Sequence, residues 1–413
     1  MRSDRRATAA LILLCTAVFL DSMDLSLVGV ALPAIGTELA LPDSTLQWLM
    51  SGYAVAYGGF LLLGGRLADL FGRRRMFLAS LTVFAAASLA GGLLSTGATG
   101  YSAGLIASGL LTQVNWRLVF FLPVPVALLV LAVAPRVIPV GRTDGPRTGF
   151  DAAGAGTVTG GVLLLVYALT ETNWLAGGAA FLLLGGFVAI ERRRRDPLVP
   201  LGVFRSGRLT SANLAALAWA CATIGWQFVA VLYLQGVLGY SALATGLGIV
   251  PMGLAIVVTA NLAGRLIGRW GLRRTAALGL LVQGAGILLF LRAGASGDYA
   301  TVLLPALIVH GVGNGLSFPS LNIAAVGSLP DDRQGLASGL VTSAVQVGAG
   351  IGVAVLAAVM AIPASPLDGY RAAFLSAGAF SLLGAFIAYL GLRVRAEPAA
   401  PEPTRTAPTS TRA

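Results

Sequence analysis

Residues 65–75 read GRLADLFGRRR, and residues 264–274 read GRLIGRWGLRR. Each copy follows an apolar stretch long enough to cross a membrane, and each ends in a glycine followed by arginines. A motif that returns in the second half of an apolar chain is typical of membrane transporters built from two related halves. The repeat therefore predicts an all-α membrane protein with two helical bundles.

Composition agrees with a membrane protein. Of the 413 residues, 56% are hydrophobic and only 11% are charged, whereas a soluble domain carries about 25% charged residues. The net charge of +11 comes from arginines that gather in short runs between apolar stretches. Cytoplasmic loops show this pattern, so a nucleic-acid partner is not expected. Two cysteines and a single histidine, His310, offer no metal cluster.

Twelve apolar stretches are long enough to span the bilayer. They lie at 8–34, 47–65, 76–95, 118–135, 153–171, 175–190, 210–234, 242–264, 274–293, 300–323, 336–361 and 370–392. A weaker thirteenth stretch, 99–113, would place most arginines outside if it crossed the membrane, so the charge distribution favours twelve spans with both termini cytoplasmic. The expected domains are an N-terminal bundle (1–135, internally shortened), two linker helices with a cytoplasmic loop (136–208), a C-terminal bundle (209–392) and a disordered tail (393–413).

Two acids, Asp21 and Asp24, lie within the first apolar stretch. A carboxylate at bilayer depth costs at least about 2.5–3.5 kcal/mol on insertion scales, so its presence points to function. The two lie three residues apart on roughly one helix face, where they could share a proton. Both are candidates for proton coupling. The alternatives are a structural hydrogen bond from Asp24 to Ser26 or a neighbouring helix, and a water-filled vestibule for Asp21.

Residues 65–75 resemble the loop signature of the major facilitator superfamily, G-x-L-a-D-x-x-G-R-[RK]-[RK]. Gly65, Asp69, Gly72 and Arg73 occupy its key positions. The resemblance implies a charged latch between the second and third helices that steadies one access state. The alternative is a plain cytoplasmic turn whose arginines only mark the inner side.

Residues 23–33, MDLSLVGVALP, are similar to the first-helix motif of the drug/proton antiporters with fourteen helices, and 191–198, 235–241 and 335–340 match further. Residues 100–109 resemble only the end of the antiporter motif, with Gly100, Gly104 and Gly109 kept. Relative to that subfamily, the fourth helix and part of the fifth are missing. An internal deletion of two helices from fourteen would leave twelve.

Polar and aromatic residues in later spans are candidates for lining a central cavity: Trp226, Gln227, Asn314 and Gln346. Aromatic faces bind cations, and amides either line a cavity or join helices. Tyr233 and Gln235 suit helix–helix hydrogen bonds better, and Glu171 suits a span end. The glycines of HGVGNG, residues 310–315, are expected to allow close helix packing, and His310 is expected to be structural rather than a proton carrier.

The function that these features indicate is proton-coupled efflux of hydrophobic or cationic small molecules across the cell membrane, driven by the proton gradient without a cofactor or metal. We expect a monomer whose partners are its small-molecule substrate, protons and the lipid bilayer. Proton-coupled uptake of a metabolite is the alternative, as is a transport-impaired binding protein that lacks a helix. No enzyme is expected, because the sequence shows no nucleophile, metal cluster or soluble catalytic domain.

Overall fold

The structure is a computed structural model. It describes residues 72–93, 123–137, 151–171, 173–194, 197, 199–294, 298–330, 333–363 and 365–393, together with the single positions 16, 33, 36, 46 and 48. Within these residues the secondary structure is helical throughout, without a strand.

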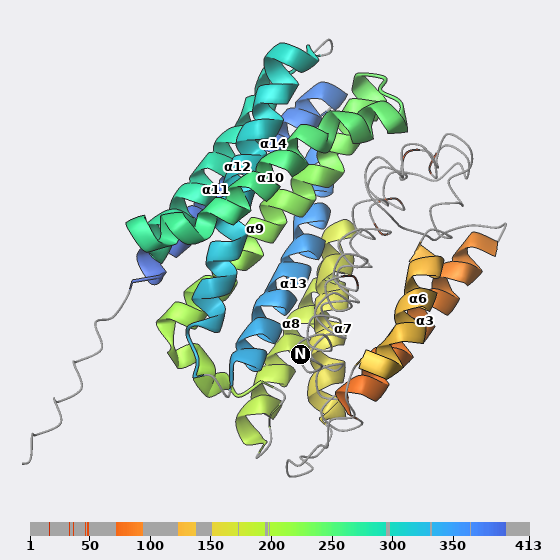
Figure 1. The fold of residues 1–413 in the computed structure, drawn as a ribbon, viewed down its shortest axis with the longest axis vertical. Coiled ribbons are helices and arrows are strands. Elements are labelled where there is room, and N and C mark those ends of the chain that lie inside the picture. The colour runs from red at the N-terminus through yellow and green to blue at the C-terminus, as the bar shows by residue number, and fades with distance from the viewer. Residues whose placement is uncertain are drawn as a thin grey trace, which may run out of the picture.

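Figure 1 labels the described α-helices in chain order. The α-helices are α3 (Arg73–Leu93), α6 (Pro123–Val137), α7 (Ala152–Thr170), α8 (Trp174–Arg193), α9 (Gly207–Leu232), α10 (Ala242–Trp270), α11 (Leu272–Leu289), α12 (Leu304–Val326), α13 (Gln334–Met360) and α14 (Pro366–Gly391). Short helical turns join them: η1 (Leu201–Arg205), η2 (Tyr233–Val237), η3 (Phe290–Arg292) and η4 (Tyr299–Leu303).

Eight of the described segments are long and apolar enough to cross a membrane. They coincide, within six residues at each end, with the apolar stretches expected from residue 153 onward; the largest difference is at α10, which continues to Trp270 rather than ending at 264. Helices are the natural solution there, because a lipid-exposed backbone must satisfy its own hydrogen bonds. The all-helical fold predicted from composition is therefore confirmed for the described part of the chain.

Short polar caps set where these helices begin. The side chain of Asn173 accepts hydrogen bonds from the backbone N–H groups of Leu175 and Ala176, both at 3.1 Å, and starts α8. Ser241 caps α10 in the same way through the N–H of Ala244, at 3.1 Å. The first N–H groups of a helix have no carbonyl oxygen of a preceding turn to bond to, and these side-chain oxygens accept their hydrogen bonds instead.

Helix α9 lies at the centre of the C-terminal bundle and packs against α12, α13 and α14 (Figure 1). Glycines allow the backbones to approach closely: a Cβ on Gly225 would meet the backbone of Gly352 at 3.0 Å. Small residues at crossings are the usual means of packing helices in lipid. On its other side, α13 packs against α7 through Val162, Val166 and Ala354.

The sequence repeat has a counterpart in backbone geometry. Gly72, with φ +92°, directly precedes α3, and Gly271, with φ +82°, directly precedes α11. Both φ values lie in the left-handed region that favours glycine. The last glycine of each copy thus forms the turn before the next helix. The halves repeat in local structure as well as in sequence.

A pair of helices, α3 and α6, packs together at one side of the molecule (Figure 1). Its small core includes Leu81, Ala127 and Val130, and Arg74 donates a hydrogen bond to the carbonyl oxygen of Pro135 at 2.8 Å. Arg73, a residue of the predicted latch, is the first residue of α3, one position after the turn at Gly72.

Candidate functional site

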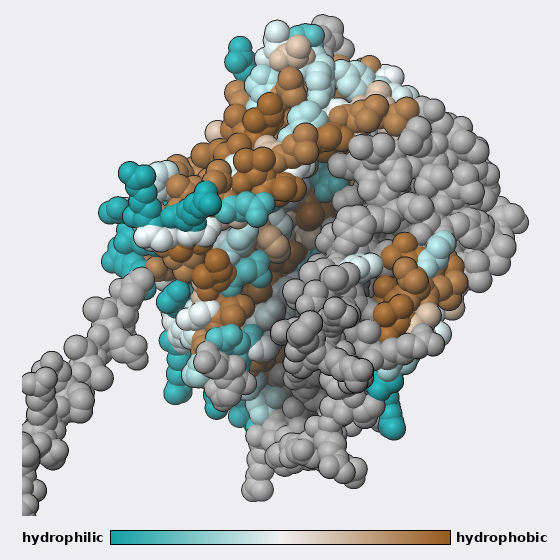
Figure 2. Space-filling view, in the orientation of Figure 1, coloured by the Kyte–Doolittle hydropathy of each residue, from teal (hydrophilic) through white to brown (hydrophobic). Residues whose placement is uncertain are grey.

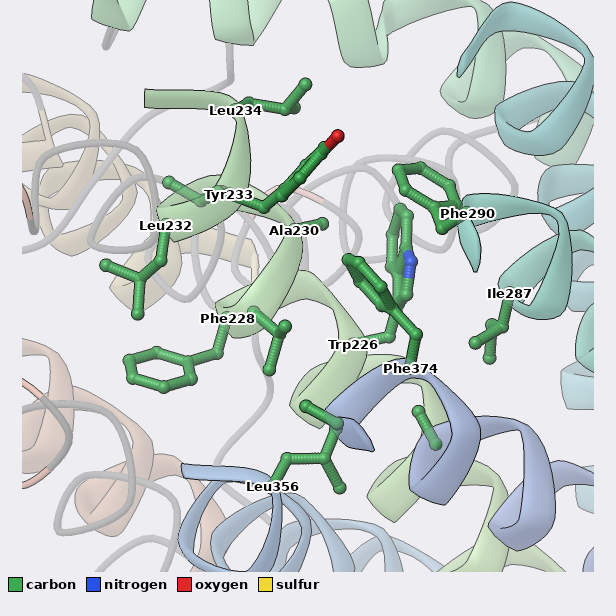
Figure 3. Close-up of a cluster of buried hydrophobic side chains, with 14 of the residues drawn as sticks. Trp226, Phe228, Ala230, Leu232, Tyr233, Leu234, Ile287, Phe290, Leu356 and Phe374 are labelled. Atoms are coloured by element: carbon green, nitrogen blue, oxygen red, sulfur yellow. The ribbon is translucent and has the colours of Figure 1, made fainter. Parts of the chain in front are cut away.

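Aromatic side chains fill the interior of the C-terminal bundle (Figure 3). Trp226 on α9 is 1% exposed and meets Phe290 of η3 edge to face, with ring centroids 5.3 Å apart. Phe290 in turn lies 5.2 Å from Phe374 of α14. Edge-to-face and tilted contacts of this kind suit the quadrupoles of aromatic rings. Trp226, expected to be deep in its span, is therefore packed among aromatic neighbours.

Trp226 also stacks on His310 of α12, with ring centroids 4.2 Å apart and planes inclined by 25°. His310 is fully buried; within the described residues neither of its ring nitrogens has a hydrogen-bond partner, nor does the indole nitrogen of Trp226. An unpaired buried polar atom lowers stability by about 1–3 kcal/mol. The stacked pair thus places three unsatisfied polar atoms side by side in the bundle.

Three helices are joined by a buried amide that the sequence analysis did not select. Gln283 of α11 is 0% exposed; its amide nitrogen donates to the hydroxyl of Thr223 on α9 at 2.8 Å. Its carbonyl oxygen accepts a hydrogen bond from the hydroxyl of Ser317 on α12 at 3.2 Å. A lone amide in the apolar stretch 274–293 was the available signal, because such groups hydrogen-bond between helices.

The other cavity candidates are spread over three helices. Gln227 is partly buried on α9, next to Trp226. Asn314 on α12 and Gln346 on α13 are 7% and 8% exposed. All three therefore lie within or at the edge of the C-terminal bundle, and their role as cavity lining stays a prediction.

Tyr233 serves as a helix–helix contact, as expected. Its hydroxyl donates to the carbonyl oxygen of Gly294 at 2.6 Å, and its ring meets that of Tyr370 at 5.5 Å. Gln235 follows in the π-helical turn η2 and is partly buried. These contacts join α9 to the end of α11 and the start of α14.

The glycines that follow His310 allow close packing, which confirms that expectation. A Cβ on Gly311 would meet the carbonyl oxygen of Met252 on α10 at 2.5 Å, and one on Gly315 would meet that of Ile256 at 2.6 Å. A Cβ on Gly313 would collide with the backbone nitrogen of Gln283 on α11. Helix α12 therefore presses its glycines against two neighbours at once.

Several predicted residues lie outside the described part of the chain. They are the coupling acids Asp21 and Asp24, the latch residues Gly65 and Asp69, and the motif glycines Gly100, Gly104 and Gly109. Glu171 is described: it is exposed at the end of α7, where it accepts a hydrogen bond from the indole of Trp48 at 3.2 Å. A span-end position, as expected, is what the structure shows for it.

The described helices of the C-terminal bundle are joined by buried aromatic rings, the Gln283 amide and close contacts at glycines. The described residues hold no group of three or more histidine, cysteine or acidic side chains that could bind a metal. On the face shown in Figure 2, the surface over the described helices is mainly apolar, and hydrophilic residues gather toward the ends of the helices. The described helices therefore define a polytopic helical membrane protein.

Comparison with known proteins identifies the family. The sequence profile of the Major Facilitator Superfamily matches residues 14–100, 89–353 and 251–413, so the chain belongs to this superfamily. It is 33% identical to the puromycin resistance protein pur8 of Streptomyces alboniger, over 96% of this chain and 93% of that protein. It is 32% identical to the cephamycin export protein CmcT of Amycolatopsis lactamdurans, over 91% and 90% of the two chains.

A solved structure supports the same fold. The POT family transporter PepTSo superposes with a TM-score of 0.63 at 15% sequence identity, covering 89% of this chain and 94% of that one. At such low identity the likeness concerns the fold alone. The two-bundle helical transporter architecture expected from the repeat and the loop signature is thereby confirmed.

Proposed function

We propose that this protein exports hydrophobic small molecules, antibiotics among them, in exchange for protons. The observation that carries the proposal is similarity over nearly the whole chain to proteins named for puromycin resistance and cephamycin export. The alignments extend well beyond the loop signature at residues 65–75 and include the segments on both sides of the linker helices. It favours efflux over uptake, for which no comparable observation exists.

Energy coupling is assigned to Asp24, with Asp21 three residues earlier in the first apolar stretch. Moving one proton down a membrane potential of 100 mV supplies about 2.3 kcal/mol, and a pH gradient adds to this. In the proposed cycle Asp24 binds a proton from outside and releases it inside. Its ionised form then attracts a cationic substrate.

Alternating access would come from rocking of the two bundles around a site between them. The C-terminal bundle is suited to move as one body, because α9, α11 and α12 are joined by Gln283 and by backbone contacts at glycines. Packed interfaces of this kind shift between discrete arrangements rather than deforming continuously. The turns at Gly72 and Gly271, each directly before a helix, would be matching turns of the two halves.

The direct test is flux in inverted membrane vesicles with an imposed pH gradient, using puromycin, a cephalosporin and a cationic dye. We expect accumulation of at least one of these that collapses when a protonophore removes the gradient. Asp24→Asn should abolish gradient-driven accumulation while leaving insertion intact. Glu171→Gln, which removes an exposed acid at a span end, should transport like the wild type. Full transport by Asp24→Asn would remove the coupling role.

A second candidate, a transport-impaired binding protein, rests on a specific observation. The match to the puromycin relative extends over 475 aligned positions, but 96% of this chain amounts to only about 396 residues, so the alignment contains gaps on the side of this chain. In the antiporter subfamily that the sequence resembles, the fourth helix carries an arginine motif. Loss of that helix would make Asp24 harder to ionise, because a nearby positive charge favours the carboxylate. Substrate binding without gradient-dependent flux would select this candidate.

A further inference from the structure

A cavity of about 1060 Å³ lies where the linker helices meet the C-terminal bundle. Its walls come from three segments that are far apart along the chain: the end of α8 with the connection that follows it, the turn η1, and the start of α13. The lining residues are Glu191, Arg192, Arg194, Pro197, Pro200, Leu201, Gly202, Arg205, Arg333 and Leu336. Four of the ten are arginines.

This cavity is at the arginine-rich end of the molecule. Consecutive spans joined by short connections alternate in direction, so the end of α8, the start of α9, the end of α10 and the start of α13 share one side. The described arginines on that side of the linker helices and C-terminal bundle are Arg192, Arg193, Arg194, Arg205, Arg208, Arg265, Arg269, Arg273, Arg274, Arg333 and Arg393, against Arg292 and Arg371 on the other. An imbalance of this kind marks the cytoplasmic side of membrane proteins.

Two acids of the described part of the chain, Asp151 and Glu191, form contacts in the wall of the cavity. Asp151 is 2% exposed; it caps α7 by accepting the N–H of Gly154 at 2.8 Å and forms an ion pair with Arg194 at 3.3 Å. Glu191 is 3% exposed and accepts the N–H of Val199 at 3.3 Å. These contacts join the ends of α7 and α8 to the connection that leads into η1.

The turn η1 is likewise fixed. The hydroxyl of Thr210 on α9 donates to the carbonyl oxygen of Phe204 at 2.8 Å, and the side chain of Val203 is 7% exposed in the core. Arg205, which follows directly, is thus attached to an ordered turn. Among the described residues, no carboxylate forms an ion pair with Arg192 or with Arg205.

We propose that this cavity binds a phosphate group, supplied by the headgroup of an anionic phospholipid or by a soluble phosphate ester. The planar guanidinium presents paired donors that match a phosphate oxyanion bidentately. Basic pockets beside membrane helices on the cytoplasmic side take anionic headgroups, and Leu201 and Leu336 supply apolar wall for the adjoining glycerol and acyl carbons. A bound phosphate would join three elements: the end of α8 through Arg192, the turn η1 through Arg205 and the start of α13 through Arg333.

Such a ligand would affect transport, because it binds elements from both sides of a junction. Helix α13 packs against α7 as well as against α9. A ligand that contacts α8, η1 and α13 at once favours the orientation of the bundles in which Arg192, Arg205 and Arg333 lie close to one another. The site would therefore tune the balance between access states from outside the substrate path.

The test is a titration of the purified full-length protein in neutral detergent with phosphatidylglycerol, phosphatidylcholine or inorganic phosphate, following thermal unfolding. The site variant is Arg192→Gln/Arg205→Gln. Its matched control is Arg265→Gln/Arg269→Gln, which removes the same charge from the last two turns of α10 at the same end of the molecule but leaves the cavity lining intact.

We expect phosphatidylglycerol to stabilise the wild type and the control alike, with apparent affinity reduced about tenfold or more in the site variant. Stabilisation by inorganic phosphate with the same variant pattern would assign the site to soluble phosphates, and a response to phosphatidylglycerol alone would assign it to lipid. Equal losses in both variants, or a response to phosphatidylcholine as strong as to phosphatidylglycerol, would overturn the proposal.

Should the glutamine variant fail to fold, Arg192→Lys/Arg205→Lys replaces it, with Arg265→Lys/Arg269→Lys as its control. Lysine keeps the charge but loses the planar fork, so the site pair must still bind phosphatidylglycerol more weakly than its control. Equal affinity of the two lysine pairs would also overturn the proposal.

Discussion

Replacing Gly271 by alanine should destabilise the protein through backbone conformation alone. Gly271 has φ +82°, and a Cβ built on it would have no heavy atom within 4 Å. The substitution therefore creates no collision. What remains is the penalty for placing a residue with a side chain at φ +82°, ψ 154°, a region essentially restricted to glycine, which costs about 1–3 kcal/mol.

The turn cannot easily relax to avoid this penalty. The N–H of Gly271 donates to the carbonyl oxygen of Ile267 at 2.9 Å, closing α10. Its own carbonyl oxygen accepts the N–H and the hydroxyl of Thr275, at 3.2 and 3.0 Å, which starts α11. Thr275 is 1% exposed, so a change of φ at Gly271 would disturb hydrogen bonds at both helix ends.

The chain offers a matched control three residues earlier. Gly268 is exposed on α10, has no positive φ and likewise leaves open space around a Cβ. Gly268→Ala should be neutral or stabilising by about 0.5–1 kcal/mol, because alanine favours a helix over glycine. The two alanine variants should thus differ by about 1.5–4 kcal/mol.

The assay is reversible unfolding in mixed micelles with increasing SDS, monitored by circular dichroism. Gly271→Ala should unfold at lower SDS than the wild type, and Gly268→Ala at the same level or higher. Equal stability of the two variants would refute the reasoning, because it would mean that the turn does not need the left-handed conformation. Gly72→Ala should behave like Gly271→Ala if the two halves share this turn.

Three further outcomes can be checked on the same protein. Gln283→Leu removes two interhelical hydrogen bonds and should lower the free energy of unfolding by about 1–2 kcal/mol. Its control is Asn261→Leu, which should have little effect, because the exposed amide of Asn261 donates to the carbonyl oxygen of Val257 within the same helix. Gly313→Ala would force a methyl against the backbone of α11 and should lower stability by about 1–3 kcal/mol or prevent folding, whereas Gly253→Ala meets open space and should be tolerated. Hydrogen bonds from Thr301 lower the pKa of the Asp298 carboxyl below its ordinary 3.8. The ionised carboxylate therefore caps η4 at neutral pH, and this stabilisation is lost as pH falls through the lowered pKa. Amide hydrogen exchange at residues 299–303 should accelerate in that pH range, and Thr301→Val should move the start of the acceleration to higher pH.

Local sequence properties were sufficient for the spans and the repeat. A run of about 20 apolar residues is long enough for a membrane helix whatever its neighbours are, so the stretches from residue 153 onward could be placed to within six residues. The glycines at 72 and 271 could be singled out by their place before arginines in both halves. Each of these properties depends on residues close together in the chain.

The buried amide of Gln283 and the arginine-lined cavity depended on the tertiary structure. Gln283 meets Thr223 and Ser317 only because α9, α11 and α12 pack with particular rotations, and hydropathy does not encode rotation. Arg192, Arg205 and Arg333 each look like an ordinary marker of the inner side in the sequence. They line one cavity only because segments that are far apart in the chain pack together. The sequence of one segment does not specify which other segment it contacts.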